Sequence, residues 1–255
     1  MNPPIGSIVT GAGGVIGRTI CCELAARGAS VMVVDTDLNA AEESAQMVRD
    51  GGAASVVVQA DVTSEQDVAG YVQRAVELWG GVDWFANNAG IEGPAAPVTE
   101  FPAEDFRRVL DVNVTGVFLG LKHVIAAMRT RGGGRIVNSA SVAGLYATPL
   151  LIAYGASKHA VIGMTRTAAI ETASDGIKVN AVCPGPQYSR MMDSIEEHVR
   201  PDDPKSMRDA YTASVPMGRY GYPEEIASTV AWLLAEAPPY LTGQNIVIDG
   251  GLLVA

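Results

Sequence analysis

The sequence predicts an α/β fold in which a parallel sheet of about seven strands carries helices on both faces. Short apolar runs rich in β-branched residues recur along the chain and have the length of buried strands. Stretches with helical periodicity separate these runs, so strands and helices alternate. Hydrophobic residues make up 48% of the 255 residues and charged residues 18%, which is enough apolar material for a large core.

The individual elements follow from this alternation in chain order. Strands are expected at 5–10, 30–35, 55–60, 82–87, 134–139, 177–182 and 245–248. Helices are expected at 15–27, 37–50, 65–79, 102–130, 153–174 and 223–236. Alternation of this kind implies parallel strands joined by right-handed crossovers. No linker or shift in composition divides the chain, and we expect a single domain over residues 1–255.

The least regular part of the sequence is the segment 186–216, which follows a strand and contains several prolines. It is long for a connection, and we expect it to form a lid over a ligand site. A surface excursion without function is the alternative. Four side chains would give the lid an apolar face unless they pack as core: Tyr188, Met191, Met192 and Ile195. His198, in a charged part of the segment, is expected to be solvated.

A glycine-rich turn, T-G-A-G-G-V-I-G at residues 10–17, joins the first predicted strand to the first helix. Glycines allow a sharp turn and a close approach of the backbone to a pyrophosphate, which the helix N-terminus then binds. Four candidate cofactor-binding positions lie in this turn: Gly11, Gly14, Val15 and Ile16. A tight connection without a ligand is the alternative. Placed at the start of an alternating chain, the turn indicates a Rossmann-type, doubly wound sheet.

Two acidic residues follow predicted strands at the carboxyl edge of the sheet, where open α/β folds bind ligands. Asp35 ends the second strand, and its carboxylate can accept hydrogen bonds from the adenosine ribose hydroxyls but would repel a 2′-phosphate. Because Thr36 and Asp37 come next, no cation follows, and the sequence favours NAD over NADP. Asp61, with Val62, follows the third strand and could contact the adenine or simply cap the next turn.

Tyr154 and Lys158 lie four positions apart at the start of a predicted helix and therefore share one face. A phenol normally titrates near pH 10, too high for a base at neutral pH. An ammonium about 4 Å away, at an effective dielectric near 20, would favour the phenolate by about 4 kcal/mol before any desolvation cost. The pair is therefore a candidate for general acid–base catalysis, with an exposed helix pair as the alternative.

Two further polar residues are catalytic candidates. Ser141 follows the fifth predicted strand, and its hydroxyl could bind a substrate oxygen on which charge develops. Asn113 lies inside a helical stretch, where asparagine is unfavourable unless its side chain has a partner. A hydrogen-bond relay and a local helix irregularity explain Asn113 equally well.

Taken together, these residues resemble the short-chain dehydrogenase/reductase family over nearly the whole chain. The resemblance implies interconversion of an alcohol and a ketone with a nicotinamide cofactor and no metal, and commonly a homotetramer. It rests on an ordered set of motifs: the turn at 10–17, Asp35, Asp61-Val62, Asn87-Asn88-Ala89-Gly90, Asn113, Ser141, Tyr154 with Lys158, Pro184-Gly185, and the ending at 241–251.

The resemblance assigns roles by position. Tyr154 would be the general acid/base, and Lys158 would bind the nicotinamide ribose and lower the pKa of the tyrosine. Ser141 would orient the substrate oxygen, and Asn113 would help to hold a water that links Lys158 to solvent. The remaining cofactor contacts would be Asn88 near the adenosine ribose and, beside the nicotinamide, the segment that begins at Pro184-Gly185 and includes Gln187 and Ser189.

The sequence departs from the usual family pattern at two places. Val15 occupies the middle glycine of T-G-x-x-x-G-x-G, so the turn instead fits T-G-x-x-G-x-x-G through Gly14. Gln187 stands where an aliphatic residue is usual, and the neighbouring Tyr188 could reach the pocket. The extension 91–93 after the asparagine motif is similar to that of dehydrogenases that act on cyclic alcohols and ketones.

Composition and charge exclude several classes of partner. The net charge of −10 disfavours nucleic acid and anionic membranes, which are polyanions. Three cysteines, two of them adjacent, form neither a disulfide framework nor a zinc motif, and no signal peptide is recognisable, so we expect a cytoplasmic protein. A non-catalytic NAD-binding sensor, or an epimerase or dehydratase on the same scaffold, is the alternative to an NAD-dependent dehydrogenase.

Overall fold

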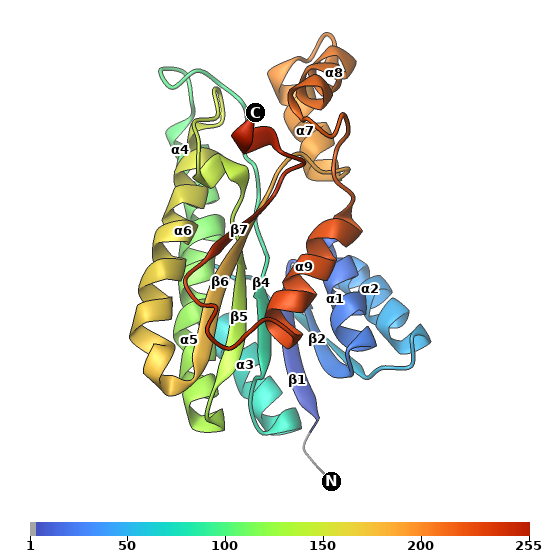
Figure 1. Cartoon of the computed structure of the whole chain (residues 1–255), viewed down its shortest axis with the longest axis vertical. Helices are drawn as coiled ribbons and strands as arrows, with labels where there is room; N and C mark the ends of the chain where they lie inside the picture. The colour runs from blue at the N-terminus through green and yellow to red at the C-terminus, as the bar shows by residue number, and fades with distance from the viewer. Residues whose placement is uncertain (1–3) are drawn as a thin grey trace.

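The computed structural model describes residues 4–255 and confirms the predicted doubly wound α/β fold (Figure 1). The strands are β1 (Ile5–Thr10), β2 (Ala29–Asp35), β3 (Ser55–Gln59), β4 (Trp84–Asn87), β5 (Gly134–Ser139), β6 (Ile177–Pro184) and β7 (Asn245–Ile248). They form one sheet in the order β3-β2-β1-β4-β5-β6-β7, and every neighbouring pair is parallel. These boundaries lie within two residues of those predicted.

Nine α-helices are assigned within the described residues. They are α1 (Val15–Ala26), α2 (Leu38–Asp50), α3 (Glu65–Trp79), α4 (Ala103–Leu110), α5 (Gly116–Arg131), α6 (Ile152–Thr172), α7 (Arg190–Val199), α8 (Pro204–Ser214) and α9 (Pro223–Ala235). Helices α1, α2 and α9 cover one face of the sheet, and α3, α5 and α6 cover the other.

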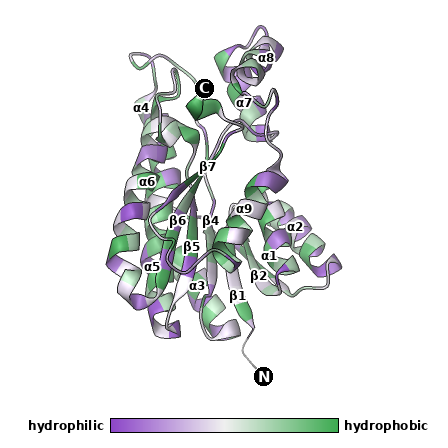
Figure 2. Cartoon of the chain, in the orientation of Figure 1, coloured by the Kyte–Doolittle hydropathy of each residue, from purple (hydrophilic) through white to green (hydrophobic). Residues whose placement is uncertain are grey.

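Burial on both faces explains the nearly continuous apolar strands. In β2, Val31 and Val33 pack in the core beneath α1, α2 and α9, whereas Met32 and Val34 pack in the core on the opposite face. Successive side chains of a strand point to opposite faces, so a strand covered twice needs apolar residues throughout. Figure 2 shows that strands and helices differ in this respect: the strands are mostly hydrophobic, whereas the helices mix hydrophobic and hydrophilic residues.

The predicted helix at 102–130 is interrupted. Between α4 and α5, residues Asp111–Thr115 form one π-helical turn. This turn contains the buried Asn113, so the sequence was right to indicate an irregularity there. The run Ala103–Arg131 is long and apolar enough to cross a membrane by length and composition alone. In the fold, however, its residues Val117 and Val124 lie in the core between helix and sheet.

The segment 186–216, the least regular part of the sequence, is more regular than expected, because it folds into α7 and α8. Ser189 caps α7 by accepting a hydrogen bond from the Met192 N–H, and Asp203 caps α8 by accepting one from Ser206. Pro204 occupies the first turn of α8, where a missing N–H costs nothing. One of the prolines that suggested irregularity therefore marks a helix start.

The strand order fixes where a ligand can bind. The chain leaves β1 toward β2 and β3 on one side, then crosses to β4 on the other side of β1. The connections that follow β1 and β4 therefore diverge and leave a crevice at the carboxyl ends of these strands.

Candidate active site

A cavity of about 1180 Å³ lies at the carboxyl ends of the strands, where the crevice was expected. It is bordered by the glycine-rich turn, the ends of the central strands, the start of α6 and the segment that leads into α7. All but one of the predicted site residues line it: Gly11, Gly14, Val15, Ile16, Asp35, Asp61, Val62, Asn88, Ser141, Tyr154, Lys158, Gln187 and Ser189. The exception is Asn113, which is buried behind the wall of the cavity.

The glycine-rich turn presents the N-terminus of α1 to the cavity. Gly14 is the N-cap residue and offers no side-chain cap, so the first N–H groups of the helix are free to bind an anion. Gly11 has a φ of +63°, and a Cβ there would lie 2.8 Å from the Ala89 Cα. At Gly17 a Cβ would overlap the Gly11 carbonyl oxygen, whereas at Gly14 it would only touch that oxygen at 3.5 Å.

These distances show which glycines the turn requires. The required positions include Gly13, which was not among the predicted site residues, since a Cβ there would lie 2.7 Å from the Ala40 Cβ. Val15, at the usual middle glycine, is 44% exposed and begins α1 without distorting it. The turn thus keeps a cradle of the size and polarity that suits a pyrophosphate.

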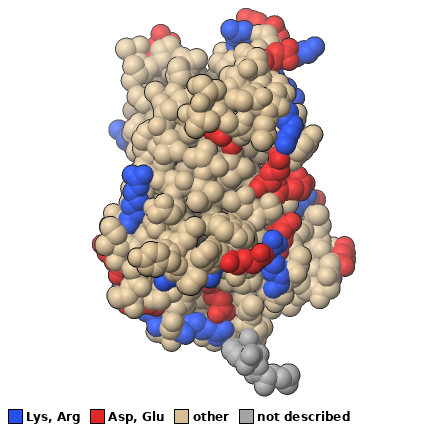
Figure 3. Space-filling model, in the orientation of Figure 1, with Lys and Arg blue, Asp and Glu red and all other residues tan. Residues whose placement is uncertain are grey.

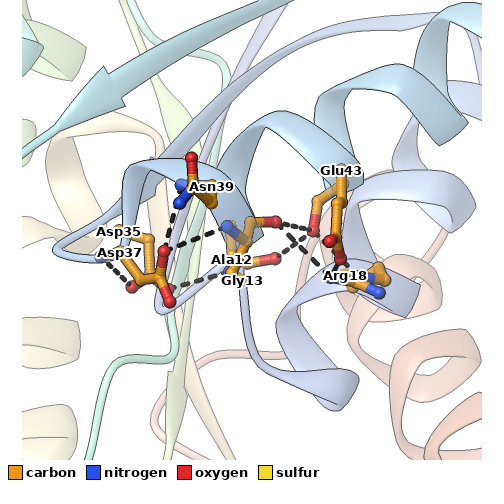
Figure 4. A network of polar contacts seen from close by, with 9 residues as sticks. Ala12, Gly13, Arg18, Asp35, Asp37, Asn39 and Glu43 are labelled. Atoms are coloured by element: carbon orange, nitrogen blue, oxygen red, sulfur yellow. Dashed lines mark hydrogen bonds and ion pairs between the residues drawn. The ribbon is translucent and has the colours of Figure 1, made fainter.

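Asp35 is held over this turn by backbone hydrogen bonds (Figure 4). Its Oδ2 accepts from the Gly13 N–H at 2.8 Å, and its Oδ1 accepts from the Asp37 N–H at 3.0 Å. Both bonds come from rigid turns, so the carboxylate keeps a fixed orientation at the cavity wall.

Arg18, a cation on the adjoining helix α1, is already engaged elsewhere (Figure 4). Its Nη2 lies 2.8 Å from the Glu43 carboxylate, and its Nε donates to the Ser44 hydroxyl at 3.0 Å. Ser44 in turn donates to the Ala12 carbonyl at 2.8 Å. The network joins the glycine-rich turn to α2 and directs Arg18 toward Glu43.

Asp61 fits both predicted interpretations. It lines the cavity, and it also caps the turn after β3, because its Oδ1 accepts from the N–H and the hydroxyl of Thr63 at 2.9 and 2.8 Å. Val62 packs against Gly116, where a Cβ would lie 2.7 Å from the valine Cγ2. The two residues therefore shape the wall of the cavity as well as facing it.

Asn88 joins three strand ends beneath the cavity. Its Nδ2 donates to the Thr10 carbonyl at 3.1 Å, and its Oδ1 accepts from the Ser139 hydroxyl at 3.0 Å. Thr10, buried at the end of β1, accepts hydrogen bonds through its hydroxyl from the N–H groups of Asn88 and Ala89. Thr10 was not predicted as a site residue, although it opens the glycine motif.

Asn113 uses the π-helical turn to reach the segment after β4. Its side chain exchanges two hydrogen bonds with the backbone of Ile91, each 2.8 Å long, and donates to the Ser157 hydroxyl at 3.0 Å. A Cβ on Gly90 would lie 3.2 Å from the Asn113 Oδ1 and 3.4 Å from the Lys158 Nζ. Asn113 and Lys158 thus face each other across Gly90, a proximity that the predicted relay requires.

Tyr154 and Lys158 lie on one face of α6, one turn apart, as the spacing predicted. The Lys158 side chain is buried, its Nζ donates to the Ser139 carbonyl at 2.8 Å, and it lies 5.4 Å from the centre of the Tyr154 ring. Beside them, the Ser141 hydroxyl accepts from the Ala143 N–H at 3.1 Å. Elements from β5 and α6 therefore bring the three side chains to one wall.

The electrostatics of this wall differ from the expectation. Burial raises the pKa of Tyr154 to about 12, with the Ser141 hydroxyl acting in the opposite direction. Burial also lowers the pKa of Lys158 to about 8, so the ammonium is itself disfavoured. The predicted net lowering of the tyrosine pKa is therefore absent in the free protein, because burial penalises the charged form of both groups.

Gln187 and Ser189 lie where the chain enters α7. The Gly221 N–H donates to the Pro186 carbonyl, and the Tyr188 N–H donates to the Gly221 carbonyl, so Gln187 pairs with Gly221 in a short parallel bridge. The expectation that Tyr188 reaches the pocket is wrong, since it is not among the residues that line the cavity. Instead its ring lies 5.5 and 5.1 Å from those of Tyr220 and Tyr222, measured between ring centres.

Helices α7 and α8 cover the cavity, and a buried glutamate on α7 binds an arginine on α8. Three of the predicted apolar side chains line the cavity: Met191, Met192 and Ile195. Glu196, on α7, is only 2% exposed; it accepts from the Tyr220 hydroxyl at 2.8 Å and from the Arg208 Nε at 2.9 Å. Nothing in the sequence pattern had singled out Glu196. His198 is exposed, as expected, and shares a hydrogen bond with Ser194.

The site contains carboxylates but no arrangement typical of a metal centre. Among residues 4–255, no group of three His, Cys, Asp or Glu side chains is placed to hold a metal ion. The chemistry that the side chains of the cavity offer is instead proton transfer and hydrogen bonding beside a pyrophosphate cradle.

Comparison with known proteins identifies the class of protein that this fold and site define. The family model described as enoyl-(acyl carrier protein) reductase matches residues 11–253. The chain belongs to the short-chain dehydrogenase/reductase family and is an oxidoreductase, which confirms the resemblance seen in the sequence.

Individual relatives cover almost the entire chain. Levodione reductase of Leifsonia aquatica is 37% identical over 96% of this chain and 92% of its own length. Cyclohexanol dehydrogenase of an Acinetobacter species is 36% identical over 96% of this chain and 93% of its own length. The crystal structure of levodione reductase matches with a TM-score of 0.96 at 37% identity and covers 98% of both chains.

A further solved structure, NAD⁺-bound xylitol dehydrogenase, matches with a TM-score of 0.93 at 40% identity. It covers 98% of this chain and 99% of its own. The relatives therefore share the whole architecture, including the helices that cover the cavity, and not the dinucleotide-binding half alone.

Proposed function

We propose that the protein interconverts a cyclic secondary alcohol and the corresponding ketone with NAD, and that Tyr154 is the general acid/base. The observation that carries the proposal is that Tyr154, Ser141 and Lys158 line the same cavity as Asp35 and the uncapped N-terminus of α1. The names of relatives, such as cyclohexanol dehydrogenase, support a cyclic substrate. A bound nicotinamide would accept or supply the hydride.

The side chains of the cavity wall would bind the substrate oxygen and transfer the proton. Ser141 holds the substrate oxygen by a hydrogen bond, and Tyr154 removes the hydroxyl proton in oxidation or returns it in reduction. Since burial raises the pKa of Tyr154 to about 12, the free protein holds the proton that reduction of a ketone requires. Protonated Lys158 favours the phenolate needed for oxidation, and the Asn113 segment lies on the path by which a proton could leave.

The preference for NAD rests on Asp35 and Arg18. The fixed carboxylate of Asp35 would accept hydrogen bonds from the ribose and repel a 2′-phosphate. Arg18, on the helix α1 that follows the glycine-rich turn, pairs with Glu43 and is not free to compensate. Both features act in the same direction, in favour of NAD.

The test is NADH formation from cyclic secondary alcohols, with NAD and NADP compared, for the native protein and Tyr154→Phe. We expect NAD-dependent turnover that falls by about 10²- to 10⁴-fold in the variant, the usual contribution of a general acid/base. Turnover that persists in Tyr154→Phe would contradict the assigned role. NAD binding without turnover of any secondary alcohol would favour a non-catalytic sensor instead.

We further propose a cytoplasmic homotetramer. Two large apolar side chains support self-association, Phe118 on α5 at 51% exposure and Ile170 on α6 at 80%. The face that carries β7 likewise has a broad central area with few charged side chains (Figure 3). Light scattering coupled to size-exclusion chromatography tests this assembly, and a monomeric mass would contradict it.

A further inference from the structure

Two tyrosines from distant parts of the chain face the cavity in addition to Tyr154. Tyr146 lies in the connection between β5 and α6, and Tyr211 lies on α8. Both side chains are partly buried and line the cavity. Burial raises the pKa of Tyr211, and Tyr146 across the same cavity raises it further.

A third hydroxyl lies on the same side of Tyr154. The Thr148 Oγ1 is buried and has no hydrogen-bond partner among the described residues. It lies 3.2 Å from the position that a Cβ on Gly155 would occupy, so it sits against the first turn of α6 beside Tyr154. Buried hydroxyls are nearly always paired, so an unpaired one beside a cavity leaves a donor and an acceptor available to a polar group of a ligand.

Apolar side chains also line this cavity. Leu151 and Met192 line it together with Ile195, which is buried on α7. A saturated ring fits such surroundings, and hydroxyls placed among them can fix its orientation. A phenol both donates and accepts, so it can bind either a hydroxyl or a ketone oxygen.

We propose that Tyr146 and Tyr211, with Thr148, bind a second oxygen on the substrate ring, so that the enzyme prefers uncharged cyclic diols, hydroxyketones or diones. This inference rests on the proposed function, because it takes the first oxygen of the substrate to lie between Ser141 and Tyr154. Besides burial, the Asp249 carboxylate raises the pKa of Tyr146, and Glu196 raises that of Tyr211. Negative charge already lies near these phenols, so a carboxylate in the second position would be repelled, and the substrate class is neutral.

The experiment compares three substrates: cyclohexanol, cyclohexane-1,4-diol and 4-hydroxycyclohexanecarboxylate. For each, kcat/KM for NADH formation is measured with the native enzyme and with Tyr146→Phe and Tyr211→Phe, which remove only a hydroxyl. Tyr240→Phe is the matched control, since Tyr240 is fully exposed and lies outside the cavity. Thermal unfolding followed by circular dichroism verifies that each variant is folded.

We expect the native enzyme to prefer the diol over both other substrates by about tenfold, the discrimination of one well-formed hydrogen bond. Tyr146→Phe and Tyr211→Phe should each lower kcat/KM for the diol by about tenfold and leave that for cyclohexanol within about twofold. Tyr240→Phe should change neither value.

Three results separate the inference from the proposed function. Equal losses for cyclohexanol and the diol, or no preference for the diol, would overturn the inference while leaving the dehydrogenase in place. A preference for the carboxylate would overturn the claim of a neutral substrate. Failure of the native enzyme to oxidise any of the three, although NAD binds, would refute the proposed function itself.

Discussion

Replacing Asp35 by asparagine should shift cofactor selection from NAD toward NADP. The carboxylate is fixed by the N–H groups of Gly13 and Asp37 at 2.8 and 3.0 Å, so it cannot turn away from an approaching 2′-phosphate. Two unit charges about 5 Å apart at an effective dielectric near 20 repel by about 3 kcal/mol. Removing this repulsion should improve NADP binding by about 10²-fold.

The same substitution should weaken NAD binding. A hydrogen bond to a charged group contributes about 1.5–3 kcal/mol, so losing the carboxylate at the ribose should raise the Kd for NAD by about 10- to 100-fold. Isothermal titration calorimetry with both cofactors measures these changes without any substrate. Asp37→Asn is the control, because Asp37 caps α2 through Asn39 and Ala40, and asparagine retains that capacity.

Unchanged affinities for both cofactors in Asp35→Asn would refute this reasoning, and so would a similar change in Asp37→Asn. In the first case Asp35 would serve only to shape the turn at Gly13. In the second, the selection would arise from the net charge around α2 and not from one positioned carboxylate.

Three other predictions follow from the geometry of the cavity wall and its turn. The rate of alcohol oxidation should rise with pH above neutrality in pH–rate profiles, because the pKa of Tyr154 lies near 12 and only its phenolate accepts a proton; a rate that falls over this range would contradict the assignment. Lys158→Met should remove turnover yet raise Tm by several degrees at neutral pH, because folding of the native protein buries the charge of Lys158. This gain in Tm should shrink as the pH rises from about 8, the pKa of Lys158 in the folded protein, to beyond its ordinary pKa of 10.5. Calorimetric scans across this pH range measure the gain, and a gain that grows with pH would contradict the prediction. Gly17→Ala should abolish NAD binding or destabilise the fold, since its Cβ would overlap the Gly11 carbonyl oxygen, whereas Gly14→Ala should be tolerated. Equal NAD affinities for the two variants would contradict the conclusion that the turn requires glycine at position 17 but not at position 14.

The sequence predicts most of the fold because its patterns are local. Strand β2 is recognisable from its apolar run, and the turn at 10–17 from its glycines. What it misses depends on tertiary contacts. The helix α7 carries Glu196 on a buried side, and only the pairing with Arg208 and Tyr220 makes that burial tolerable.

The candidate site likewise combines features that the sequence predicts with features that depend on tertiary contacts. Asp35, Tyr154 and Lys158 are predictable because strand ends and helical spacing place them. The pKa values of Tyr154 and Lys158 are not predictable in this way, since they depend on how deeply the fold buries both groups. Tyr146 and Tyr211 are far apart in sequence, and only the position of α8 over the cavity brings them together.

The bridge between Gln187 and Gly221 also has a consequence for how relatives of this protein can diverge. The chain departs for α7 and returns from α8 at neighbouring points, so these helices form a cassette inserted at one place on the scaffold. Changes of length or sequence inside the cassette alter the residues above the substrate and leave the backbone of Tyr154 and Lys158 undisturbed. Substrate range can therefore change by exchange of this one segment, while the residues proposed to transfer the proton keep their positions.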